Sequence, residues 1–153
     1  MMIKKILSVL ILLLLTSCGY QAIYSSKGLS NISILKIDLK GEEVVDRELL
    51  SLLTSRLEIN PSSNDIIELN SKKEVVHLSK DNSGNIKIYN NKITTILTLK
   101  EDKKVVGTKT FISDFSYNSI ANNFDLQQYQ KKIDQNLIRK ISEDILMYLI
   151  SIK

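Results

Sequence analysis

The sequence predicts an α+β domain built as a two-layer sandwich, with two helices packed on one face of a four-stranded, mostly antiparallel sheet. Two segments, 43–58 and 123–151, space their apolar residues with the period of an amphipathic helix, and most of the remaining apolar residues lie in segments that alternate as strands do. The resulting order is β-α-β-β-β-α. A sheet with one apolar face needs amphipathic helices to cover that face, and 153 residues favour a single domain.

The first strand and the first helix are expected on either side of Gly41. Residues 32–39 have apolar side chains in an imperfect alternation, which predicts a short strand ending before Gly41. Over 43–58 the apolar residues fall on one helical face. This stripe consists of Val45, Leu49, Leu52, Leu53 and Leu57. The pair Asn60-Pro61 ends the helix, because the residue before a proline is pushed out of the α region.

Three strands are expected next, over 65–79, 85–100 and 105–117. Two turn signals separate them, Asp81-Asn82-Ser83-Gly84 and Glu101-Asp102-Lys103-Lys104. Strands joined by tight turns form an antiparallel meander. In the second strand the alternation changes phase near Asn90-Asn91, which predicts a bulge or bend there.

The longest helical pattern lies at the C-terminal end of the chain. From Leu126 to Ile152 the apolar residues recur every three or four positions. Asn122 is the expected N-cap, with Asp125 in the first turn near the positive end of the helix dipole. At about 1.5 Å per residue, a helix over 123–151 is about 40 Å long and crosses a small sheet completely.

Catalytic and metal-binding motifs are not found. One cysteine and one histidine rule out an intrachain disulfide framework and a zinc site made of thiolates and imidazoles. His77 has no nucleophile or metal-ligand motif around it, so a structural or surface histidine is the favoured interpretation. There is also no P-loop, GxSxG or HExxH motif. We therefore expect no catalytic residue, no metal and no cofactor, and a protein that is not an enzyme.

The N-terminus has the pattern of an export signal. Basic residues at Lys4 and Lys5 precede a ten-residue, almost entirely apolar run over 6–15, which is typical of a signal peptide and too short to span a bilayer comfortably. Leu15-Thr16-Ser17-Cys18 resembles the bacterial lipobox, whose cysteine thiolate accepts the lipid. We expect a signal over 1–17, an acylated tether over 18–31 and a single domain over 32–153. The alternative is an ordinary signal followed by a chance cysteine. By analogy with bacterial sorting rules, Gly19 rather than Asp favours the outer membrane.

The charge distribution indicates one basic region. Removal of the signal takes Lys4 and Lys5, which lowers the net side-chain charge from +4 to +2 and makes nucleic-acid binding by bulk charge a poor interpretation. Between Ser71 and Lys109, however, nine lysines outnumber four carboxylates. Ammonium groups hold phosphates as point charges, so this meander is a candidate face for a phosphorylated glycolipid. The alternatives are an ordinary solvated sheet face with edge-protecting lysines, or polar tips at Asp81–Asn85 and Asn90-Asn91 that meet a protein partner.

Two stretches resemble the LptE family of lipopolysaccharide-assembly lipoproteins. The run Leu-Thr-Ser-Cys-Gly-Tyr-Gln-Ala-Ile-Tyr over 15–24 is similar to the mature start of that family, with Ala22-Ile23-Tyr24 where Pro-Leu-Tyr is common. Phe115-Ser-Tyr-Asn118, a short link and a long terminal helix are similar to its end, and the element order also agrees. The resemblance implies an outer-membrane lipoprotein facing the periplasm.

The same resemblance implies a function as a non-catalytic adaptor. LptE-like proteins act as a plug and assembly partner of the β-barrel LptD in lipopolysaccharide transport, and the family is associated with lipopolysaccharide binding. No family motif marks the lipopolysaccharide contacts, so the candidates come from the charge count: Lys72, Lys73, Lys87, Lys103 and Lys104. The alternative function is another lipid-anchored periplasmic scaffold, or a small enzyme of unrecognised type.

Overall fold

The computed structural model describes residues 32–152. The predicted signal, the tether and Cys18 lie outside these residues. The elements are β1 (Ser33–Ile34), β2 (Lys36–Leu39), α2 (Glu43–Thr54), β3 (Glu58–Ile59), β4 (Asp65–Lys80), β5 (Ile86–Glu101), β6 (Lys104–Asn118) and α3 (Asn123–Ile152).

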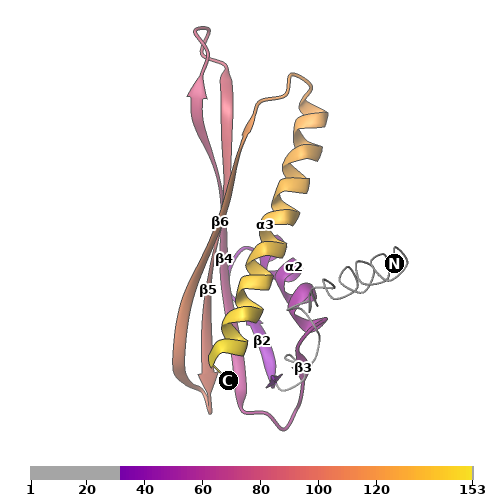
Figure 1. Cartoon of the computed structure of the whole chain (residues 1–153), viewed down its shortest axis with the longest axis vertical. Coiled ribbons are helices and arrows are strands. Elements are labelled where there is room, and N and C mark those ends of the chain that lie inside the picture. The colour runs from indigo at the N-terminus through magenta and orange to yellow at the C-terminus, as the bar shows by residue number, and fades with distance from the viewer. Residues whose placement is uncertain (1–31, 153) are drawn as a thin grey trace, which may run out of the picture.

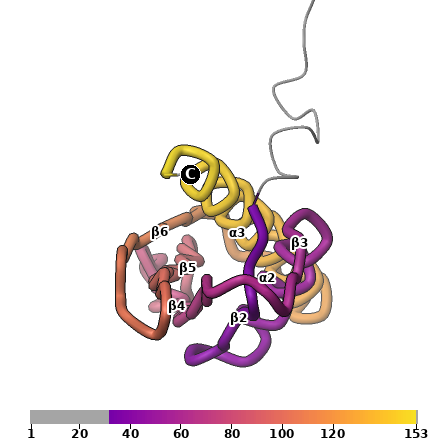
Figure 2. The backbone as a smooth tube through the Cα atoms, turned by 90° about the horizontal axis from the view of Figure 1, so that it is seen from below, coloured from indigo at the N-terminus to yellow at the C-terminus, as the bar shows by residue number. Residues whose placement is uncertain are grey.

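The main sheet has four strands in the order β2-β4-β5-β6. β4, β5 and β6 pair antiparallel as the predicted meander, whereas β2 pairs parallel to β4. The parallel pair follows from the connection, because α2 crosses back over the sheet between β2 and β4. Both helices lie on the same side of the strands (Figures 1 and 2). The predicted fold class is confirmed.

The N-terminal part of the fold differs from the prediction in two places. The single strand expected over 32–39 is split at Leu35 into β1 and β2, and β1 joins a separate two-stranded sheet with β3. The helix expected over 43–58 ends at Thr54, because Glu58 and Ile59 pair with Ser33 and Ile34 instead. Leu57 is nevertheless buried with the helical leucines. The apolar spacing therefore predicted the burial of Leu57 correctly, but the residues after it form β3, which pairs with β1, instead of a last helical turn.

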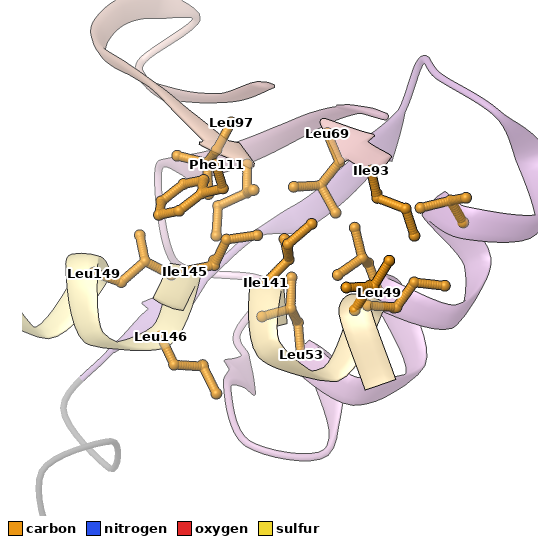
Figure 3. Packing of buried hydrophobic residues seen from close by; sticks show 14 of the residues in the cluster. Leu49, Leu53, Leu69, Ile93, Leu97, Phe111, Ile141, Ile145, Leu146 and Leu149 are labelled. Carbon is orange, nitrogen blue, oxygen red and sulfur yellow. The ribbon is translucent and has the colours of Figure 1, made fainter. Parts of the chain in front are cut away.

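The core lies between the sheet and the two helices. The odd-numbered residues of β4 and β5, such as Leu69, Ile93 and Leu97, meet the stripe Ile141, Ile145 and Leu149 of α3. Figure 3 shows this layer from close by, with Leu49 and Leu53 of α2 next to Ile141. Full burial of one such side chain contributes about 1.5–3 kcal/mol, so this layer is the main source of stability.

The long C-terminal helix begins as predicted. The side-chain Oδ1 of Asn122 accepts hydrogen bonds from the backbone N–H groups of Phe124 (2.9 Å) and Asp125 (3.4 Å), so Asn122 is the N-cap. The apolar residues of the spaced pattern are buried, except that Tyr129 and Ile152 are exposed. α3 runs along the length of the sheet (Figure 1).

The predicted bulge at Asn90-Asn91 is wrong. Pairing with β4 and β6 continues without a shift through both residues, and the irregularities lie near Leu78 and between Leu99 and Lys100. Asn91 has the same parity as Ile93, and its side chain is 0% exposed. The apparent phase change in the sequence is therefore a polar residue on the buried face of a regular strand.

The two turns of the meander lie at opposite ends of the sheet (Figure 1). We call the end with the β5–β6 turn the proximal end and the end with the β4–β5 turn, Asp81–Asn85, the distal end. The described chain starts at the proximal end, because the N–H of Leu35 donates to the carbonyl of Asp65 (2.7 Å), which faces Glu101 at the end of β5.

Gly41 is the point where the chain passes closest to β4. Its neighbours bind β4 on both sides, since the N–H of Lys40 donates to the carbonyl of Leu69 (2.8 Å) and that of Glu42 to the carbonyl of Ser71 (2.7 Å). A Cβ atom on Gly41 would stand 2.0 Å from the backbone nitrogen of Ser71.

We therefore expect Gly41→Ala to destabilise the domain by about 3 kcal/mol, because backbone atoms on both sides must shift. Urea unfolding followed by circular dichroism measures this change. Gly107→Ala is the matched control, since its Cβ would meet only the Tyr148 hydroxyl at 3.5 Å. Equal stability of the two variants would contradict the close approach.

Candidate functional site

The five lysines predicted to contact lipopolysaccharide do not gather on one face. Lys72 and Lys73 point to opposite faces of β4, and the Lys72 ammonium group pairs with Glu74 (2.8 Å) on the face away from the helices. Lys87 lies near the distal end, whereas Lys103 and Lys104 lie at the proximal turn. All but Lys73 are exposed. The positive excess counted from the sequence is therefore spread over the length of the molecule.

Lys73 belongs to a polar cluster between the sheet and α3. Its Nζ forms an ion pair with Oδ2 of Asp134 at 2.5 Å, and the two side chains are 29% and 17% exposed. The other carboxylate oxygen, Oδ1, accepts a hydrogen bond from Nδ2 of Asn91 (2.8 Å). Oδ1 of Asn91 in turn accepts from the Tyr117 hydroxyl (2.9 Å). The four side chains come from β4, β5, β6 and α3, so this cluster connects all three meander strands to the helix.

A row of aromatic side chains continues from the polar cluster across the sheet. His77 contacts Tyr89 edge-on (5.3 Å between ring centroids), Tyr89 stacks on Tyr117 (5.5 Å), and Tyr117 meets Tyr129 of α3 edge-on (5.6 Å). Burial raises the pKa of the Tyr117 hydroxyl above its usual value of 10.0. Tyr117 thus stays neutral and donates its hydrogen bond throughout the physiological range. His77 is exposed, which agrees with its interpretation as a surface residue.

The sequence did not reveal this cluster, although two signals were present. One was Asn91, which keeps the parity of the buried face; the other was Asp134, directly after the apolar Ile133 in the long helix. A buried amide or carboxylate needs hydrogen-bond partners, and those partners come from strands that are distant in sequence. The arrangement holds α3 against the sheet, and each polar atom named here is satisfied by another member of the cluster.

Two negative findings concern the part of the chain that the structure describes. No group of three or more histidine, cysteine, aspartate or glutamate side chains there is arranged to hold a metal ion. No helix between residues 32 and 152 is long and apolar enough to cross a membrane.

Comparison with known proteins finds similarity in structure alone. No protein-family model matches the chain, and no curated protein matches its sequence. Rare lipoprotein B from Shewanella oneidensis has a similar structure, with a TM-score of 0.61 and 14% identity over 76% of this chain and 94% of that one. A minor lipoprotein from Acinetobacter baumannii has a TM-score of 0.64 and 12% identity, over 80% of this chain and 93% of that one. An uncharacterised lipoprotein B from Nitrosomonas europaea has a TM-score of 0.64 and 12% identity, over 84% of this chain and 88% of that one.

The chain has the fold of these lipoproteins. It spans nearly the full length of each of them. At 12–14% identity the similarity lies in the arrangement of strands and helices rather than in particular side chains.

The polar cluster leads to a stability prediction. Asp134→Ala removes the acceptor of both Lys73 and Asn91 and leaves two largely buried donors without partners, which we expect to cost about 2–3 kcal/mol. Chemical unfolding measures the loss. The matched control is Glu74→Ala on the exposed face, whose ion pair with Lys72 is solvated and contributes little. If both variants lose the same stability, the cluster does not hold α3.

Proposed function

We propose that this protein is a lipid-anchored outer-membrane lipoprotein that acts as plug and assembly partner of an LptD-type β-barrel in lipopolysaccharide transport. The observation that carries the proposal is the coincidence of two independent features. The first is the lipobox-like Leu15-Thr16-Ser17-Cys18 at the end of a signal-like segment. The second is a domain fold shared with lipoproteins over nearly their full length.

The face of the sheet that points away from the helices is compatible with a position of the protein inside a barrel. The interior of a membrane barrel is polar, so a plug needs a polar surface without a large excess of one charge. On this face Lys72 pairs with Glu74 (2.8 Å) and Lys100 with Glu68 (2.6 Å). Asp114 accepts a hydrogen bond from Asn90 (3.0 Å). The ion pairs on this face therefore compensate their own charges, and the same face also exposes the apolar side chains of Val76, Ile96 and Ile112.

A plug also needs a stiff body. β4, β5 and β6 are 15 or 16 residues long and pair along nearly their full length, and one helix of 30 residues packs against them. The polar cluster holds that helix near its middle. A domain of this shape is an elongated rod (Figure 1), which suits an adaptor that fills a lumen rather than one that closes around a small substrate.

The barrel partnership is tested by co-purification. A tagged full-length chain, expressed in a Gram-negative host together with the LptD-type barrel of its own genome, is extracted in mild detergent. We expect the barrel protein to be retained through affinity and size-exclusion chromatography, because a plug buries much of its surface in the lumen. Its absence from a chain that is folded and membrane-bound would contradict the plug function.

The anchor is tested separately. Cys18→Ala removes the thiol that accepts the lipid, so we expect the chain to be lost from membranes washed with high salt. Ser17→Ala is the matched control, because it keeps a small residue before the cysteine. Immunoblots of washed membranes measure the outcome. Full retention of the Cys18→Ala chain would show that the protein is not a lipoprotein.

Lipopolysaccharide binding is tested with the exposed lysines, because changing Lys73 would disturb the polar cluster. Two charge-reversal pairs separate the candidate regions: Lys72→Glu with Lys87→Glu, and Lys103→Glu with Lys104→Glu. We expect at least one pair to weaken binding on the order of tenfold, since each reversal replaces attraction to phosphate with repulsion. Lys131→Glu with Lys132→Glu, exposed on α3, is the control. Unchanged affinity in both test pairs would exclude these lysines as contacts.

A further inference from the structure

The proximal turn presents two lysines followed by two exposed valines. Asp102 and Lys103 have positive φ angles of 48° and 68°, which is the conformation of a tight two-residue hairpin turn. Val105 and Val106 follow directly and are 60% and 54% exposed. Within residues 32–152, neither Lys103 nor Lys104 forms an ion pair. We call Lys103–Val106 the proximal tip.

The proximal tip lies at the end of the molecule from which the predicted tether departs. The described chain begins at Ile32, and three residues later the N–H of Leu35 donates to the carbonyl of Asp65, which pairs with Glu101 at the proximal end of β5. Fourteen residues separate Cys18 from Ile32 when Cys18 is included, and a chain of that length reaches at most about 50 Å. β4 alone, with 16 residues, is about as long. The acyl anchor therefore keeps the proximal end near the membrane more readily than the distal end.

We propose that, before the domain enters a barrel, the proximal tip inserts into the phospholipid headgroup layer next to the acyl anchor, so that the domain stands on the membrane with its proximal end down. The proposal rests on the anchoring part of the proposed function. Exposed aliphatic side chains enter the boundary between headgroups and acyl chains, while lysine stems extend their ammonium groups back to the phosphates.

The valines contribute more to this contact than the charges. Glu101 and Asp102 are exposed directly before the two lysines of the tip, so residues 101–106 together carry no net charge, and attraction to anionic lipid is weak. Insertion of two valines is also weak by itself. The anchor compensates for this, because a tethered group experiences an effective concentration in the millimolar range. A contact too weak to bind a free domain is then sufficient to orient a tethered one.

The distal end provides the alternative orientation. It also exposes apolar side chains, among them Val75, Val76, Leu78 and Phe115. Insertion of that end would turn the domain over and would require the tether to extend along the whole sheet. The two orientations place different residues in the bilayer, so a probe at each end distinguishes them.

The experiment uses the acylated full-length protein in vesicles of phosphatidylethanolamine and phosphatidylglycerol. Acylation blocks Cys18, the chain's one cysteine, so Lys103→Cys or Ser83→Cys introduces a unique thiol for an environment-sensitive fluorophore. Ser83 lies in the distal turn. We expect the probe at 103 to emit at shorter wavelength and to be quenched about threefold more by brominated lipids than the probe at 83, as for a group at the headgroup boundary.

Matched substitutions identify the side chains that cause the contact. Val105→Asp with Val106→Asp should abolish the extra quenching at 103, whereas Val75→Asp with Val76→Asp should leave it unchanged. Because all four valines are exposed, these variants are expected to fold, and circular dichroism checks this. Equal quenching at both ends, or stronger quenching at 83, would overturn the proposal while leaving the anchor intact. A chain that does not float with the vesicles would instead overturn the anchor and this inference together.

Discussion

The structure depends on one constraint, which is that a single long helix must lie in register along one face of a long sheet. Apolar contacts alone do not define that register well, because the buried stripe of α3 is mostly isoleucine and leucine at equivalent spacing, and such side chains pack acceptably after a shift of one turn. The ion pair between Lys73 and Asp134 is specific, since a shift would leave both charges and Asn91 without partners. The polar cluster thus determines where the helix rests, and the apolar layer determines how strongly it is held.

The polar cluster divides the sheet face that packs against α3 into a proximal and a distal part with different side chains. On the proximal side of the cluster, Ile141, Ile145 and Leu149 close a dry core against the sheet. On the distal side, the same sheet face is lined by Tyr89, Tyr117 and the partly exposed Tyr129, and the edge positions Val75 and Phe115 remain exposed.

The elements with strong local signals agreed with the structure. The period of the C-terminal helix, its cap at Asn122 and the turn signals of the meander all depend on residues within a few positions of one another. The errors arose where a distant partner decided the outcome. Glu58 and Ile59 were expected at the end of the helix or after it, but they pair with β1. Asn91 lies in a regular part of β5, although its polarity indicated a break in the strand. The charge count over 71–109 was correct as a number, but it did not predict a single basic face. Successive residues of a strand point to opposite faces, and the two turns of the meander lie at opposite ends of the sheet, so the lysines are spread over the molecule.

The sequence by itself determined the fold class, both helices and the three meander strands, because hydrophobic period and capping are properties of neighbouring residues. The lipobox-like pattern is equally local, and the export signal that it predicts stays a prediction. The sequence also shows that residues 18–153 carry little net charge. Only the tertiary structure decided which polar residues are buried together and which lysines share a surface. It also placed the exposed valines of the proximal tip at the end where the described chain begins. Those features join β4, β5, β6 and α3, which are separated by up to 61 positions in the Lys73–Asp134 pair, and no local pattern encodes a contact at that separation.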